Sequence, residues 1–92
     1  MRKILLVEDD ALLNRTLTYN LTEEGYQVTS ASRYREAVQH IQATEFDLAL
    51  LDVNLPDGSG LDLCQEIRGR GQRTYLMFLT ANDREADILQ GY

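Results

Sequence analysis

Short apolar runs of strand length alternate with segments of helical periodicity along the whole chain. Strands are predicted at the apolar runs 4–7, 48–51 and 75–79, and at residues 26–31, which are β-rich and partly alternating. Residues 4–7 and 48–51 are continuously apolar, as in strands that are covered on both faces. Between the runs, apolar side chains recur at helical spacing, as in the first segment, where we expect Leu13, Leu17 and Leu21 to be core residues. Repeated strand–helix units of this kind predict an α/β fold with a parallel sheet and helices on both faces.

The helical segments also carry signals for their ends. Asp9 or Asp10 can cap the first helix, and Ser32 can cap the second. A fourth helix is predicted to begin at Asn82, in a sequence that resembles a capping box. Residues 54–60 are dense in turn-forming residues and are predicted to be a loop.

The composition is typical of one soluble domain in a reducing compartment. Hydrophobic residues make up 43% of the 92 residues and charged residues 26%. No apolar run approaches the roughly 18–20 residues that cross a bilayer, so we expect no membrane partner. The one cysteine, Cys64, cannot form an internal disulfide, which favours a cytoplasmic location. The net charge of −6 disfavours nonspecific nucleic-acid binding by this segment.

Polar residues of possible functional importance follow three of the four predicted strands. Glu8 and Asp9 follow the first, Asp52 the third and Thr80 the fourth. In open parallel sheets, ligands bind outside the carboxyl ends of the strands, so three carboxylates are predicted to converge there. A cluster of oxygen ligands favours a hard cation such as Mg²⁺ or Mn²⁺. Helix capping is an alternative role for these acids; it explains Asp10 better than metal binding does, and for Asp9 the two roles stay open.

Three motifs resemble the receiver domains of response regulators. They are ILLVEDD at residues 4–10, DLALLDVNLPDGSGL at residues 47–61 and LTA at residues 79–81. The resemblance covers the whole chain and implies a flavodoxin-like (CheY-like) fold with strand order 2-1-3-4-5. The chain is most similar to OmpR/PhoB-type regulators, which carry a C-terminal winged-helix DNA-binding domain. DNA and transcription would then be reached only through a domain outside this chain.

The resemblance implies a role for each residue that matches the family pattern. Asp52 would accept a phosphoryl group from a sensor histidine kinase. Asp9 and Glu8 would hold Mg²⁺ together with Asp52 and the backbone carbonyl of Asn54. The domain would be a regulatory phospho-acceptor that assists its own phosphorylation and dephosphorylation, and not an enzyme with a separate substrate.

Other parts of the family pattern lie at or beyond the end of the chain. Thr80 and its neighbour Ala81 would contact the phosphoryl group. The family places a lysine after a fifth strand, but the only lysine here is Lys3, at the wrong end of the sheet. We therefore interpret residues 1–92 as a receiver domain with strand order 2-1-3-4, truncated at the start of the fourth helix. We expect weak Mg²⁺ binding, impaired stable phosphorylation, and self-association through the edge of the run 75–79 or by exchange of elements between chains.

Two other classes of function remain open on the sequence alone. Haloacid-dehalogenase-type phosphatases also use an aspartate at a strand end with Mg²⁺, but they need a second aspartate two residues later. Asn54 occupies that position relative to Asp52. A pseudo-receiver that binds partners without phosphorylation is the other alternative. The complete acidic set disfavours it, while the missing lysine keeps it open.

Overall fold

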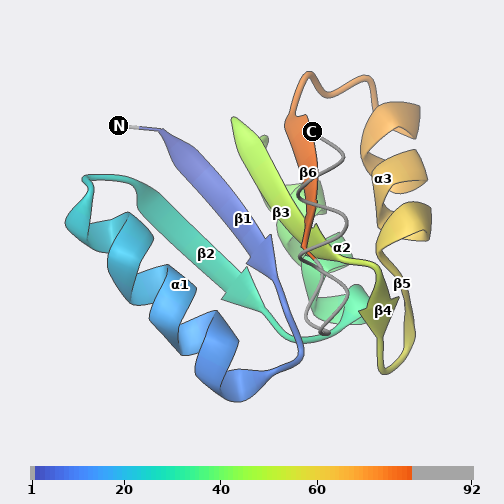
Figure 1. The fold of residues 1–92 in the computed structure, drawn as a ribbon. Helices are drawn as coiled ribbons and strands as arrows, with labels where there is room; N and C mark the ends of the chain where they lie inside the picture. The colour runs from blue at the N-terminus through green and yellow to red at the C-terminus, as the bar shows by residue number, and fades with distance from the viewer. Residues whose placement is uncertain (1, 80–92) are drawn as a thin grey trace, which may run out of the picture.

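The computed structural model describes residues 2–79, which form a parallel sheet, a small hairpin and three helices (Figure 1). The elements follow one another as β1 (Lys3–Val7), α1 (Ala11–Glu23), β2 (Gln27–Ala31), α2 (Tyr34–Ala43), β3 (Leu48–Asp52), β4 (Asn54–Leu55), β5 (Gly58–Ser59), α3 (Gly60–Gly69) and β6 (Tyr75–Leu79). All four predicted strands are present in the main sheet. None of the helices within residues 2–79 combines the length and the hydropathy of a membrane span.

The main sheet has the order β2-β1-β3-β6, and all of its strand pairs are parallel. Because β6 is the fourth strand of this sheet along the chain, the predicted order 2-1-3-4 is confirmed. The turn-rich stretch after β3 is more regular than the predicted loop. It forms an antiparallel hairpin of two short strands, with Asn54 opposite Ser59 and Leu55 opposite Gly58.

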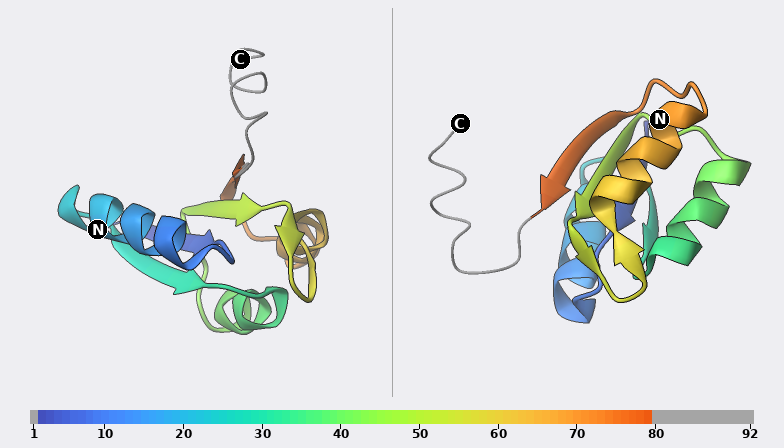
Figure 2. Two further views of the ribbon diagram at one scale, coloured as in Figure 1. Left: turned by 60° about the horizontal axis from the view of Figure 1, so that its bottom comes forward. Right: turned by 90° about the vertical axis from the view of Figure 1, so that its right-hand side faces the viewer.

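The continuously apolar strands are explained by two hydrophobic clusters, one on each face of the sheet. On β1, Leu5 and Val7 face a cluster that includes residues of α2 and α3, while Ile4 and Leu6 face a cluster on the side of α1. Figure 2 shows α1 on one side of the sheet and α2 and α3 on the other. Every residue from Ile4 to Val7 is therefore buried, whichever way its side chain points.

The predicted core role of the leucines of α1 is only partly correct. Leu13, Leu17 and Leu21 are half-buried, and α1 contains no fully buried residue. Leu17 and Leu21 do pack against the cluster on their face of the sheet. Within the described residues, α1 packs mainly against β2 and β1. The leucine face of the helix is therefore covered, among these residues, on one side only.

The predicted helix caps agree with the structure for α1 and differ for α2, and α3 has a cap that was not predicted. Asp10 is the N-cap of α1, and its Oδ1 accepts a hydrogen bond from the Leu13 amide at 3.1 Å. Ser59 caps α3 in the same way. The prediction that Ser32 caps α2 is wrong, because the N-cap is Arg33, which makes no side-chain capping hydrogen bond. Ser32 instead donates to the carboxylate of Glu36 within the first turn.

Candidate functional site

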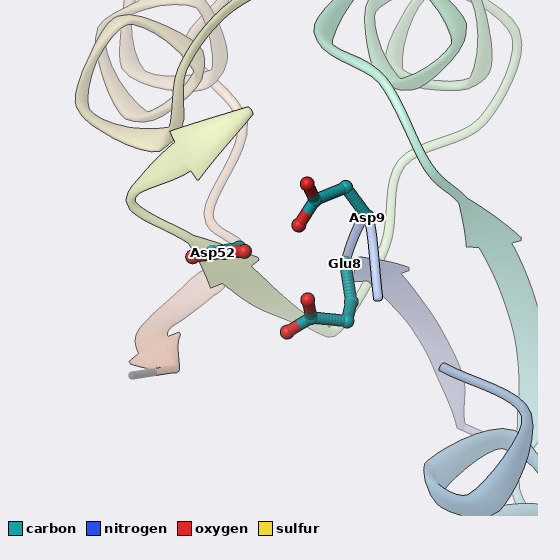
Figure 3. A group of neighbouring side chains, drawn as sticks. All are labelled: Glu8, Asp9 and Asp52. Carbon is teal, nitrogen blue, oxygen red and sulfur yellow. The ribbon is translucent and has the colours of Figure 1, made fainter. Parts of the chain in front are cut away.

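The carboxyl ends of β1 and β3 bring three acidic side chains together. Glu8 and Asp9 directly follow β1, and Asp52 is the last residue of β3. The two strands are neighbours, with Val7 paired to Leu51, so their ends lie at the same edge. One carboxylate oxygen from each acidic residue lies within 4.8 Å of the others (Figure 3). The predicted convergence of these three side chains is therefore present in the structure.

Two of the three carboxylates are removed from solvent, and one of their oxygens lacks a partner. Glu8 is fully buried and Asp52 is 7% exposed, whereas Asp9 is exposed. Glu8 Oε2 accepts a hydrogen bond from the Asp10 amide at 2.9 Å, but Glu8 Oε1 is buried without a hydrogen-bond partner among residues 2–79. A buried carboxylate oxygen with no donor is costly unless a cation satisfies it.

The electrostatics of the cluster also favour a cation. Burial raises the pKa of Glu8 to about 7, the negative charge of Asp52 contributes in the same direction, and the hydrogen bond from the Asp10 amide opposes the shift. Burial likewise raises the pKa of Asp52, against the hydrogen bond from the Asn54 amide. A divalent ion would satisfy the orphaned oxygen and offset the repulsion among the acids. The all-oxygen set of donors fits Mg²⁺ or Mn²⁺.

The raised pKa of Glu8 predicts how the metal-free protein responds to pH. The folded state binds the proton of Glu8 more strongly than the unfolded chain does. The contribution of protonated Glu8 to stability is therefore complete below about pH 4.5 and is lost as the pH rises through about 7. In EDTA at pH 8, we expect Glu8→Gln to be more stable than the wild type by about 2 kcal/mol. Urea unfolding at pH 4.5 and pH 8 measures the difference.

The control for this experiment is Glu23→Gln, which removes an exposed glutamate at the end of α1. It should change the stability little at either pH. An equal effect of Glu8→Gln at both pH values would show that the buried carboxylate is not the source of the pH dependence.

The backbone around the acids is held by groups that the sequence did not single out. Asn14, in α1, donates hydrogen bonds to the carbonyls of Glu8 at 2.9 Å and Ala31 at 3.2 Å, which ties the ends of β1 and β2 to the helix. The sequence gives little indication of this role, because Asn14 is a single asparagine beside the regularly spaced leucines of α1. Gly60 lies against the Asp52 backbone, and a Cβ there would overlap the Asp52 carbonyl oxygen.

The remaining predicted site residues fall in two groups. Asn54 begins β4, and its amide donates to Asp52 Oδ1 at 3.3 Å, so the hairpin starts beside the acidic cluster. Thr80, Ala81 and the helix predicted from Asn82 lie outside the described residues.

Comparison with known sequences gives a family match and curated relatives. Residues 4–92 match the family model of the response regulator receiver domain. The chain is 38% identical over 89 residues to the two-component response regulator PhoP of Pseudomonas aeruginosa. It is 37% identical over 90 residues to the alkaline phosphatase synthesis transcriptional regulatory protein PhoP of Bacillus subtilis. These alignments cover 97% and 98% of the chain but 40% and 38% of the relatives, so the chain spans about two fifths of their length.

Solved structures agree with this match. The response regulator TrrA of Thermotoga maritima, in complex with Mg(2+)-BeF, aligns with a TM-score of 0.82 and 32% identity over 99% of this chain and 79% of its own. TrrA in complex with the histidine kinase ThkA aligns with a TM-score of 0.80 and 34% identity over 88% of this chain and 70% of the other. With the parallel sheet, the strand-end acids and the match over residues 4–92, the chain belongs to the response regulator receiver domain family.

Proposed function

We propose that Asp52 is the phospho-acceptor of this receiver domain and takes a phosphoryl group from a sensor histidine kinase with the help of Mg²⁺ or Mn²⁺. The observation that carries the proposal is the buried oxygen of Glu8, which has no hydrogen-bond partner within residues 2–79 and lies beside Asp9 and Asp52. Such a cluster supplies both a place for a divalent cation and, in Asp52, a carboxylate that can attack phosphorus. Glu8, Asp9, Asp52 and the backbone carbonyl of Asn54 would hold the ion.

The chemistry follows from the position of Asp52. An ionised Asp52 oxygen attacks phosphorus, so that a new oxygen–phosphorus bond forms while the phosphorus–nitrogen bond to the donor's histidine breaks in line. The bond electrons leave with the imidazole, which takes up a proton. A bound divalent ion would offset the negative charge on the transferring group. The product is an acyl phosphate on Asp52, which Thr80 and Ala81 would contact.

Partners and setting are proposed by analogy with the relatives. TrrA is described in complex with a histidine kinase, and the Bacillus subtilis PhoP is described as a transcriptional regulatory protein. We infer that this chain also receives its phosphoryl group from a kinase, in the cytoplasm, and controls a DNA-binding domain outside residues 1–92. Self-association through the edge of β6, or by exchange of elements between chains, stays a prediction; within residues 2–79, β6 pairs only with β3.

The test is the dependence of phosphorylation on the metal. With labelled acetyl phosphate as donor, we expect impaired but measurable incorporation with Mg²⁺ and essentially none in EDTA. Asp9→Asn should lower the rate at a fixed Mg²⁺ concentration by at least about tenfold, because it removes a proposed ligand. Asp62→Asn removes the same charge from an exposed position in α3 and should label like the wild type.

The alternative functions predict different results in the same assay. A pseudo-receiver would take up no label with or without Mg²⁺. A phosphatase of the haloacid-dehalogenase type would release phosphate catalytically, many times per chain. Either result would contradict the proposal.

A further inference from the structure

The first turn of α2 receives its hydrogen-bond acceptors from a distant loop. Its N-cap, Arg33, makes no side-chain capping hydrogen bond. Instead, Asp57 Oδ1 accepts from the Tyr34 amide at 2.7 Å, and Asp57 Oδ2 accepts from the Arg35 amide at 3.2 Å. The amides at the start of a helix are usually satisfied by the N-cap side chain. Asp57 thus does for α2 what Asp10 does for α1, but from 22 and 23 residues away.

Asp57 lies in the turn between β4 and β5, and the hairpin also packs on the start of α2. A Cβ placed at Gly58 would lie 2.8 Å from the Cβ of Tyr34, so the hairpin backbone is in close contact with that side chain. Hydrogen bonds from amides to a carboxylate are stronger than those between neutral groups. The tip of the hairpin is therefore fixed to α2 by both packing and a charged acceptor.

The other end of the same hairpin adjoins the acidic cluster. The Asn54 amide donates to Asp52 Oδ1 at 3.3 Å, and the Gly60 amide donates to the Val53 carbonyl at 2.9 Å. Leu55 is 9% exposed and belongs to the core. A short hairpin held at its root, in its middle and at its tip has little freedom to move at one end alone.

We propose that Asp57 is a positioning residue for the cation site. By tying the β4–β5 hairpin to the first turn of α2, it keeps the Asn54 backbone and the Asp52 carboxylate in the geometry that binds the ion. Coupling of this kind is reciprocal, so ion binding strengthens the contact between Asp57 and α2. Because Asp57 acts through the proposed cation site, this role depends on the proposed function.

The experiment measures Mg²⁺ affinity from the Mg²⁺-dependent shift of the melting temperature. Asp57→Ala is expected to weaken binding about tenfold, the lower end of the effects of residues that support metal ligands. Asp57→Asn should weaken it less, because the amide oxygen can still accept from Tyr34 while the NH₂ group cannot accept from Arg35. Asp62→Asn removes the same charge and should bind Mg²⁺ like the wild type.

A second measurement distinguishes positioning from general support of the fold. In the wild type, Mg²⁺ should slow hydrogen exchange at the Tyr34 and Arg35 amides, and in Asp57→Ala their exchange should be fast and independent of Mg²⁺. Unchanged exchange in the wild type, or equal Mg²⁺ affinity of both Asp57 variants and Asp62→Asn, would overturn the proposal. If Asp57→Ala does not fold, the comparison of Asp57→Asn with Asp62→Asn decides in the same way. A wild type that binds no Mg²⁺ would instead overturn the proposed function, and this role with it.

Discussion

Asp52→Asn is expected to abolish phosphoryl incorporation while leaving the fold intact. The asparagine side chain has nearly the same shape but no anionic oxygen that could attack phosphorus. Burial raises the pKa of Asp52, so the ionised carboxylate is costly in the metal-free fold. At pH values where Asp52 is ionised, the neutral amide of Asp52→Asn should therefore make the protein more stable. Incorporation from labelled acetyl phosphate and thermal unfolding in EDTA measure the two effects separately.

The opposite direction of the two effects makes this variant informative. Lost labelling together with retained or increased stability identifies a chemical role and not a structural one. Asp62→Asn provides the charge-matched control and should keep the label. Labelling of Asp52→Asn at the wild-type level would place the acceptor elsewhere.

Gly60→Ala is expected to destabilise the protein by about 3 kcal/mol, within the range for forcing atoms into a packed site. Gly60 is a buried residue that begins α3 and lies against the backbone of Asp52. An added Cβ would overlap the Asp52 carbonyl oxygen and approach the Val53 Cα to 3.3 Å. Either β3 or α3 must shift, so Mg²⁺ binding should weaken as well. Urea unfolding and the Mg²⁺-dependent melting shift measure both consequences.

A glycine in the same helix supplies the matched control. A Cβ at Gly69, the last residue of α3, would meet no atom within 4 Å. Gly69→Ala should therefore be neutral or slightly stabilising, since alanine loses less entropy on folding than glycine. Equal stability of the two variants would contradict the close approach of α3 to Asp52.

The parts of the fold that were predicted correctly depend on local patterns. Apolar runs such as residues 48–51 mark buried strands, because a strand covered on both faces has no polar side. The convergence of the acids followed from the geometry of parallel sheets, in which strands end at a common edge. The N-cap Asp10 was predicted because capping acts over three residues.

The features that the sequence did not predict are contacts between distant segments. The capping of α2 by Asp57 joins residues 22 and 23 positions apart, and nothing local to either segment indicates it. Ser32 was a reasonable cap by residue type, but its partner is the carboxylate of Glu36, in the first turn of α2. The burial of Leu13 depends on what covers its flank of the sheet, which helical periodicity cannot specify.

The measurement that tests the proposed acceptor most directly is chemical trapping of the phosphorylated residue. Borohydride reduces an aspartyl phosphate to homoserine, so even a short-lived acyl phosphate leaves a permanent mark that mass spectrometry can place in the sequence. After treatment with acetyl phosphate and Mg²⁺, we predict homoserine at position 52 and none in EDTA. Homoserine at another aspartate, or none at position 52 with Mg²⁺ present, would contradict the assignment of Asp52 as the phospho-acceptor.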